Sequence, residues 1–148
     1  MLRSAAQRRI SKHAHPEPLT MRVLGFMSGT SLDAVDMAVL DTDGERLDGF
    51  GPAGERKLSE ATRGLVLAAT EAAKTWPRGA PEPAEFAPAA RAVADEHFAA
   101  ADAFLANNRL SWGEVDLIGF HGQTVLHERP QAGRIGRCLL YTSPSPRD

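Results

Sequence analysis

The sequence predicts an α/β fold for a chain that forms one domain. The chain has 148 residues, enough for one domain of ordinary size and too few for two well-packed ones. Hydrophobic residues make up 43% of it and charged residues 24%, which is the balance of a globular protein. Short apolar runs at 22–27 and 116–120 and an alternating pattern at 33–41 indicate strands, and apolar residues recur with helical spacing between 59 and 108. The predicted order is therefore strand, strand, strand, helix, helix, strand.

Three strands are predicted first, over residues 22–27, 33–41 and 46–58. In the second of them Val35, Met37 and Val39 share one face, because successive side chains of a strand point to opposite faces. Asp43-Gly44 is a turn signal that separates this strand from the third, which is less regular.

The first helix is predicted to begin after Ser59, whose hydroxyl suits an N-cap. It is predicted to end by Trp76, because Pro77 disfavours the helical conformation in the residue before it. Its expected apolar stripe consists of Leu65, Ala68, Ala69 and Ala72.

The second helix is predicted from Glu85 or Pro88 to about Asn108. Its expected apolar stripe consists of Val93, His97, Ala101 and Phe104 or Leu105. Ser111 is expected to cap a single helical turn. The last strand is predicted over 116–120, and a returning strand is expected to begin at 125–127.

Charge and composition exclude several classes of protein. The net charge is −2, and residues 21–137 hold 12 basic and 17 acidic residues without a basic cluster that would bind nucleic acid. No apolar run approaches the roughly 20 residues needed to cross a bilayer, and residues 1–20 lack the apolar core of a secretory signal. Cys138 is the only cysteine, which excludes an internal disulfide. We expect a cytoplasmic protein without nucleic-acid or membrane partners.

The two ends of the chain differ from the rest. Residues 1–20 are basic and lack periodicity, so we expect a disordered or spurious extension, with an organelle transit peptide as the alternative. Residues 138–148, CLLYTSPSPRD, resemble the translated adapter that transposase-based sequencing libraries leave at the ends of reads. A genuine Ser/Pro-rich tail is the alternative. The expected domain runs from residue 21 to residue 137.

Small and hydroxyl residues connect the first two strands, in the segment GFMSGTSLDAVD at 25–36. Such a turn can direct several backbone N–H groups toward an anion, and the hydroxyls of Thr30 and Ser31 add donors. Asp33 and Asp36 could hold water molecules on a magnesium ion. The alternative is an ordinary hairpin turn in which Asp33 caps backbone amides.

A second polar segment, GFHGQT at 119–124, follows the last predicted strand. Gly122 permits close backbone approach, while His121 and Gln123 supply donors and acceptors suited to the hydroxyls, amide or carboxylate of a sugar-like ligand. The alternative is a structural histidine in a hydrogen-bonded turn. His97 is expected in the core or at its rim, and no role is assigned to the other histidines.

Together, GFMSGTSLDAVD at 25–36 and GFHGQTVLHERP at 119–130 resemble the opening motifs of the anhydro-N-acetylmuramic acid kinase family, in that family's order and spacing. The family belongs to the superfamily of sugar kinases, heat-shock ATPases and actin. The resemblance covers Met21 to about Arg137, the first part of a family member. It implies a partial ribonuclease H-like (actin-like ATPase) N-terminal lobe that starts with a β-hairpin.

The resemblance implies a kinase that uses ATP and Mg²⁺. Such a kinase opens the 1,6-anhydro ring of anhydro-N-acetylmuramic acid with water and phosphorylates the freed hydroxyl. The product, N-acetylmuramic acid 6-phosphate, belongs to peptidoglycan recycling and amino-sugar catabolism. ATP and the anhydro-sugar are the implied partners, together with a homodimer for the full-length protein. The family's catalytic aspartate lies in a later segment, so we expect no catalytic residue within this chain and no activity of the chain alone.

The site residues of the family correspond to this sequence through the two motifs. The ATP loop corresponds to Gly29, Thr30, Ser31, Leu32, Asp33, Ala34, Val35 and Asp36. Among these Asp33 is the expected metal-binding residue, and His121 and Gln123 are expected to line the sugar side of the cleft. Ala34 stands where the family usually has glycine, which would strain the turn only if this position required a positive φ.

Two other functions are weighed against the kinase. One is a non-catalytic module that binds an anion or a partner protein, with the Ala-rich segment 85–108 packing on a partner helix. The other is a different member of the same superfamily, such as an acetate-type kinase or an ATPase regulator. A later strand followed by an aspartate in a glycine-rich turn would favour the anhydro-sugar kinase.

Overall fold

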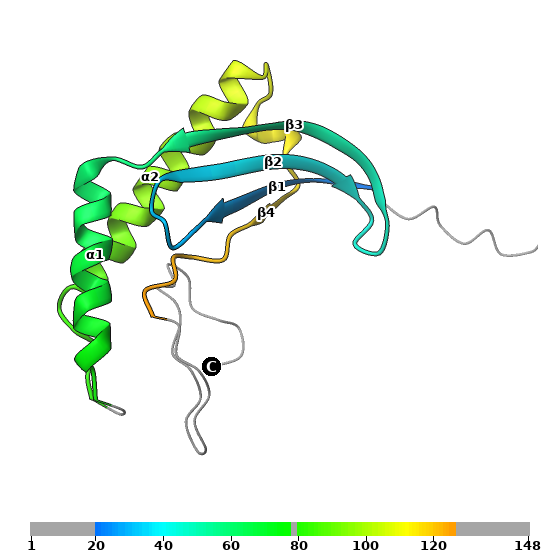
Figure 1. The fold of residues 1–148 in the computed structure, drawn as a ribbon. Coiled ribbons are helices and arrows are strands. Elements are labelled where there is room, and N and C mark those ends of the chain that lie inside the picture. Colours follow the sequence, from blue (N-terminus) through cyan, green and yellow to red (C-terminus); the bar gives the residue numbers. More distant parts are fainter. Residues whose placement is uncertain (1–19, 78–79, 127–148) are drawn as a thin grey trace, which may run out of the picture.

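The computed structural model describes residues 20–77 and 80–126, which form a four-stranded sheet and two long helices (Figure 1). The elements in chain order are β1 (Met21–Ser28), β2 (Ala34–Thr42), β3 (Leu47–Lys57), α1 (Glu60–Thr75), α2 (Phe86–Asn107), the 3₁₀ turn η1 (Trp112–Glu114) and β4 (Leu117–Gly119). The predicted α/β class and element order are confirmed. The expected extensions, residues 1–20 and 138–148, lie outside the described residues except for Thr20.

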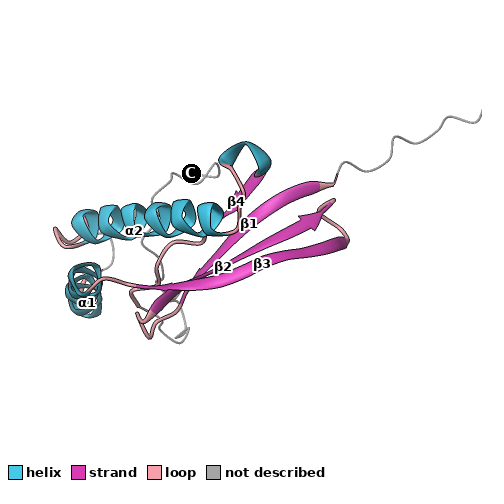
Figure 2. Ribbon diagram, turned by 90° about the horizontal axis from the view of Figure 1, so that it is seen from above, coloured by secondary structure: helices cyan, strands magenta, loops and turns pink. Residues whose placement is uncertain are grey.

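The sheet is mixed, with the strand order β3-β2-β1-β4. β1, β2 and β3 form an antiparallel meander, whereas β4 pairs with β1 in parallel. Figure 2 shows α2 lying along one face of the sheet, with α1 beside it. Because β1 and β4 run in the same direction, their C-terminal ends lie at the same edge of the sheet.

The helix-covered face of the sheet carries the core. Leu24 pairs with Val39, and Phe26 pairs with Met37. Directly opposite residues of an antiparallel pair point to the same face, so these four side chains share one layer. Leu24 is fully buried, and Val39 and Met37 are nearly so. This confirms the face predicted for the second strand.

β3 approaches the core closely because two of its residues are glycines. A Cβ atom at Gly51 would lie 2.9 Å from both Cβ and Cγ1 of Val39. A Cβ atom at Gly54 would lie 3.4 Å from the ring of Phe104 on α2. The third strand is therefore present as predicted, and its irregular composition reflects this packing.

The ends of α1 agree with the prediction, but its buried face does not. The Ser59 hydroxyl accepts the Thr62 N–H at 3.2 Å, and the helix ends at Thr75. The buried residues are Thr62, Val66, Ala69 and Ala73. Of the predicted stripe, Leu65 and Ala68 are exposed, Ala72 is half-buried and only Ala69 is buried. The contact that orients the helix is long-range, since Glu96 of α2 accepts the hydroxyl protons of Ser59 and Thr62, each at 2.7 Å.

The second half of the chain follows the prediction more closely. The predicted stripe of α2 is confirmed, because Val93, His97, Ala101, Phe104 and Leu105 are all buried. The turn after Ser111 is also confirmed, with the Glu114 carboxylate accepting both the N–H and the hydroxyl of Ser111 at 2.8 Å. β4 is present but shorter than predicted. The expected return at 125–127 lies partly outside the described residues, and within them Val125 and Leu126 form no strand.

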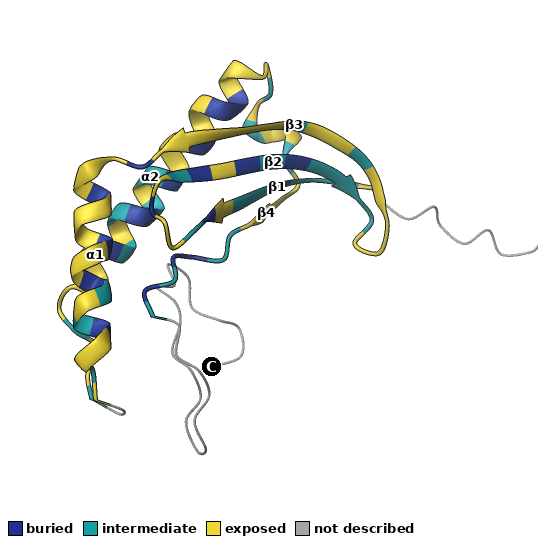
Figure 3. Cartoon of the chain, viewed as in Figure 1, coloured by how far each residue is buried: buried dark blue, intermediate teal, exposed yellow. Residues whose placement is uncertain are grey.

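The other face of the sheet is not covered by any element among the described residues. Three large apolar side chains on this face stay exposed: Met27 at 56%, Phe50 at 81% and Leu117 at 51%. β3 is exposed along most of its length (Figure 3). Neither helix is long and apolar enough to cross a membrane, within the ranges that the structure describes.

Candidate functional site

The two polar motifs meet at the edge of the sheet where β1 and β4 end. The Gln123 side-chain amide donates a hydrogen bond to the carbonyl oxygen of Gly29 at 3.3 Å. These residues are 94 positions apart, and Gln123 is 1% exposed. A part-buried contact therefore joins the turn after β1 to the segment after β4.

The hydrogen bonds that the Gln123 side-chain nitrogen donates determine what the side-chain oxygen, Oε1, can bind. Its Nε2 atom also donates to the carbonyl oxygen of Thr124 at 3.3 Å. Carbonyl oxygens only accept, so Nε2 must face them and Oε1 must point elsewhere. Oε1 is buried and has no hydrogen-bond partner among the described residues. This end of the site can accept a hydroxyl or N–H proton and is unsuited to an anion.

Ser28, His121 and His97 leave further buried polar atoms without partners in the described part of the chain. These atoms are Ser28 Oγ, His121 Nε2 and His97 Nε2. Ser28 is the last residue of β1 and His121 follows β4 by two positions. Buried polar atoms are normally hydrogen-bonded. The unpaired atoms of Ser28 and His121, at the ends of two adjacent strands, are therefore candidates for contact with a ligand or water. Ser28 was missed by the sequence analysis, although it continues the inward alternation of Leu24 and Phe26.

The turn after β1 is held by its backbone and by Leu32. The Leu32 N–H donates to the Gly29 carbonyl at 3.2 Å, and Leu32 has a positive φ of 54°. Its side chain is 5% exposed, so apolar packing holds the residue in this conformation. Ala34 is the first residue of β2 and is not among the residues with positive φ. The alanine therefore introduces no backbone strain, and the unusual conformation belongs to Leu32 instead.

Asp33 lies exposed in this turn and is hydrogen-bonded on one oxygen. Its Oδ1 atom accepts the Ser31 hydroxyl at 2.7 Å and the Ala34 N–H at 3.0 Å. The bond from Ser31 lowers the pKa of Asp33, and backbone N–H groups lower it further. The carboxylate thus stays charged at neutral pH. The Ser31 proton points to Asp33 in this arrangement, which leaves the exposed Thr30 as the hydroxyl free of partners among the described residues.

The remaining loop residues lie on different sides of the sheet. Val35 is fully buried in the core and supports the turn from below. Asp36 is exposed and pairs with Met27 on the uncovered face. The structure therefore brings Gly29, Asp33 and Gln123 to one edge but does not place Asp36 with them.

The second motif is shaped by its glycine. Gly122 is buried and has a φ of 72°, a left-handed conformation that glycine adopts without a steric penalty. It turns the chain between His121 and Gln123, so that Gln123 reaches back toward the turn after β1. The positive φ is the feature that favours glycine here, and the close backbone approach expected at Gly122 stays a prediction.

A magnesium ion would find few protein ligands at this edge. No group of three or more His, Cys, Asp or Glu side chains could hold a metal within residues 20–77 and 80–126. Mg²⁺ usually keeps several waters and binds one or two carboxylates together with substrate phosphates. The single exposed carboxylate of Asp33 fits that mode of binding, in which the phosphates supply the other ligands.

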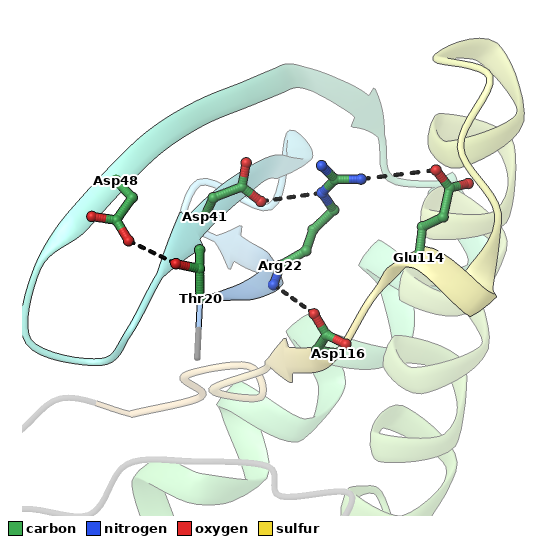
Figure 4. Close-up of a pocket in the computed structure, with 6 residues that line it drawn as sticks. All are labelled: Thr20, Arg22, Asp41, Asp48, Glu114 and Asp116. Atoms are coloured by element: carbon green, nitrogen blue, oxygen red, sulfur yellow. Dashed lines mark hydrogen bonds and ion pairs between the residues drawn. The ribbon is translucent and has the colours of Figure 1, made fainter. Parts of the chain in front are cut away.

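A polar hollow lies at the other end of β1 and β4, away from the two motifs, and has a structural role (Figure 4). Its central residue, Arg22, contacts Asp41 through Nε at 3.1 Å and Glu114 through Nη1 at 3.8 Å. The Arg22 N–H also donates to the Asp116 carboxylate at 2.8 Å. These contacts hold the start of β4 beside β1. The acidic side chains are therefore engaged in aligning the two strands whose other ends carry the motifs.

Comparison with known proteins agrees with this arrangement. Residues 21–137 match the family model described as anhydro-N-acetylmuramic acid kinase. Curated proteins of that name are 71% identical in Phenylobacterium zucineum and 67% identical in Caulobacter vibrioides, each over 119 residues. These matches cover 80% of this chain and 32% of each relative, so the chain spans about a third of their length. A relative from Rhodopseudomonas palustris is 50% identical over 110 residues, which is 74% of this chain and 30% of that protein. On this evidence the chain belongs to the anhydro-N-acetylmuramic acid kinase family.

Proposed function

We propose that this chain is the N-terminal part of an ATP-dependent kinase that opens the 1,6-anhydro ring of anhydro-N-acetylmuramic acid with water. The enzyme transfers the γ-phosphoryl group of ATP to the freed hydroxyl and forms N-acetylmuramic acid 6-phosphate. The observation that carries the proposal is the hydrogen bond from Gln123 to Gly29, which joins the two family motifs at one edge of the sheet.

The two motifs would bind different parts of the reacting pair. The turn from Gly29 to Asp33 presents backbone and the Thr30 hydroxyl, which suit phosphate oxygens. Gln123 Oε1 can only accept a hydrogen bond, so it suits a sugar hydroxyl or the N–H of an acetamido group and disfavours phosphate. His121 lies two residues from Gln123 and would contact the sugar on the same side.

Asp33 would act on the metal through its charge. Mg²⁺ neutralises negative charge on the phosphoryl group during transfer. The lowered pKa of Asp33, caused first by the Ser31 hydrogen bond, keeps a negative charge available to orient waters of that ion. The base that activates water would come from a segment that longer relatives contain, so the chain of 148 residues would bind without turning over.

The wider setting follows from this function. The enzyme would work in the cytoplasm, in peptidoglycan recycling, and would meet ATP and the anhydro-sugar there. A homodimer of the complete protein is part of the same proposal.

The test is an assay of the protein extended to the length of its relatives. With anhydro-N-acetylmuramic acid, ATP and Mg²⁺ it should form ADP and a sugar 6-phosphate, identified by ³¹P NMR and mass spectrometry. The 148-residue chain should show no turnover in the same assay. Binding of ATP by the extended protein without phosphorylation of the sugar would overturn the kinase proposal and favour a binding module.

A further inference from the structure

His97 lies between the ends of the two strands that carry the motifs. Its ring centroid is 4.9 Å from that of Phe120 and 5.7 Å from that of Phe26, both in edge-to-face geometry. Phe26 and Phe120 also contact each other at 6.3 Å. One side chain of α2 therefore touches β1 two residues before Ser28 and touches the residue directly before His121.

The protonation state of His97 follows from its surroundings. Its Nδ1 atom is 2.7 Å from the Val93 carbonyl oxygen, which can only accept, so Nδ1 carries a proton. The ring is 4% exposed, and burial lowers its pKa. His97 is thus neutral at pH 7, with Nδ1–H bound to its own helix and its ring in edge-to-face contact with the two phenylalanines.

We propose that His97 is a positioning residue for the candidate site: its ring, oriented by Val93, holds the ends of β1 and β4 in the arrangement that lets Gln123 reach Gly29. The inference rests on the proposed function only in treating these motifs as the ligand-binding segments. The geometry itself can be tested without a ligand.

The first test compares His97→Ala with Val93→Ala in the 148-residue chain. Val93 is 1% exposed on the same buried stripe, and its backbone carbonyl is unaffected by the substitution, so Val93→Ala is a matched loss of core packing. Hydrogen exchange followed by NMR would give protection factors for Gly122 and Gln123. After correction for global stability, we expect His97→Ala to lower them about 10-fold more than Val93→Ala does, since only the first opens this segment locally. Equal losses in the two variants would overturn the proposal.

The second test uses His97→Phe, which keeps an aromatic ring between Phe26 and Phe120. At pH 7.5 this variant should restore the protection factors of Gly122 and Gln123 to near the wild-type values. As the pH falls below the ordinary pKa of histidine, about 6.5, the wild type should lose protection, because a charged imidazole is disfavoured between two apolar rings, whereas His97→Phe should not. Two other titratable groups lie near His97: His121, from the segment after β4, and Glu96 on α2, which is bound to Ser59 and Thr62. Both remain in His97→Phe, so an unchanged acid-induced loss in that variant would assign the effect to them and overturn the role of His97.

Discussion

At the scale of single residues, substitutions of Asp33 and Thr30 distinguish the contribution of charge from that of hydrogen bonding in the turn after β1. In the full-length enzyme Asp33→Asn removes the charge that would organise Mg²⁺, while Thr30→Ala removes one hydroxyl and leaves the backbone amides. We expect kcat to fall about 100-fold or more for Asp33→Asn, about 2.7 kcal/mol on the transition-state scale, and less for Thr30→Ala. Steady-state kinetics with both substrates measures this. Normal turnover of Asp33→Asn would show that the carboxylate only caps the hairpin.

His121 should act on the other substrate. In the proposed function His121 binds the sugar together with Gln123, two residues later in the chain, whereas the turn from Gly29 to Asp33 binds the phosphates. His121→Ala should therefore raise the KM for the anhydro-sugar and leave the KM for ATP near the wild-type value. Separate titrations of the two substrates check this, and a parallel rise in both constants would contradict the division between the motifs.

His97 should also make the stability of the domain depend on pH. Burial lowers its pKa in the folded state, so the unfolded chain binds a proton more readily. The contribution of neutral His97 to stability is complete above its unfolded pKa of about 6.5 and is lost progressively as the pH falls below that value. The free energy of unfolding of the wild type should decrease relative to His97→Phe over this range in chemical denaturation. Parallel pH profiles would contradict this expectation.

At the scale of elements, two glycines with opposite surroundings test the packing of β3 and α1. Gly64 is exposed within α1, and a Cβ atom added there would have no neighbour within 4 Å. Because glycine is less favourable than alanine inside a helix, Gly64→Ala should stabilise the protein by about 0.5–1 kcal/mol. Gly51→Ala would place a methyl group 2.9 Å from Val39, so it should destabilise the protein by about 1–3 kcal/mol. Thermal and denaturant unfolding measure both changes. A neutral Gly51→Ala would show that β3 can move away from the core.

The face of α1 illustrates why an apolar pattern alone can mislead. The sequence of this helix is rich in alanine and leucine, so stripes one residue apart look similarly apolar. The face that packs inward consists of Thr62, Val66, Ala69 and Ala73. On this side Glu96, which lies in another helix, accepts hydrogen bonds from the hydroxyls of Ser59 and Thr62. With this face turned inward, Leu65 is left exposed.

At the scale of the whole molecule, the uncovered sheet face should promote self-association of the 148-residue chain. Phe50 and Leu117 are exposed on this face, and contiguous apolar surface of this kind is typical of interfaces. Phe50→Ser and Leu117→Ser should lower the sedimentation coefficient at high concentration. Phe98→Ser is the control, because Phe98 is 64% exposed but lies on α2, stacked on Trp112. A wild-type chain that stays monomeric at high concentration would contradict the expectation.

Local signals in the sequence were sufficient for the elements themselves. The alternation of Val35, Met37 and Val39, the cap at Ser59 and the stop before Pro77 each act within a few residues of one another. The same holds for α2, whose stripe is long enough to define one face. These features depend on backbone geometry and side-chain spacing, which neighbouring residues determine.

The assembly of the site was decided by the tertiary structure. The sequence identified His121, Gln123 and the turn at residues 29–36 as candidate binding residues, in two motifs that resemble those of one kinase family. It did not show that β4 pairs in parallel with β1, that Gln123 donates to Gly29, or that Leu32 takes the strained conformation of the turn. Nor did it show that His97 contacts a phenylalanine of each motif, Phe26 and Phe120. These contacts join residues that are far apart in the chain. They form only when the sheet and α2 pack together, because each residue finds its partner in a different segment.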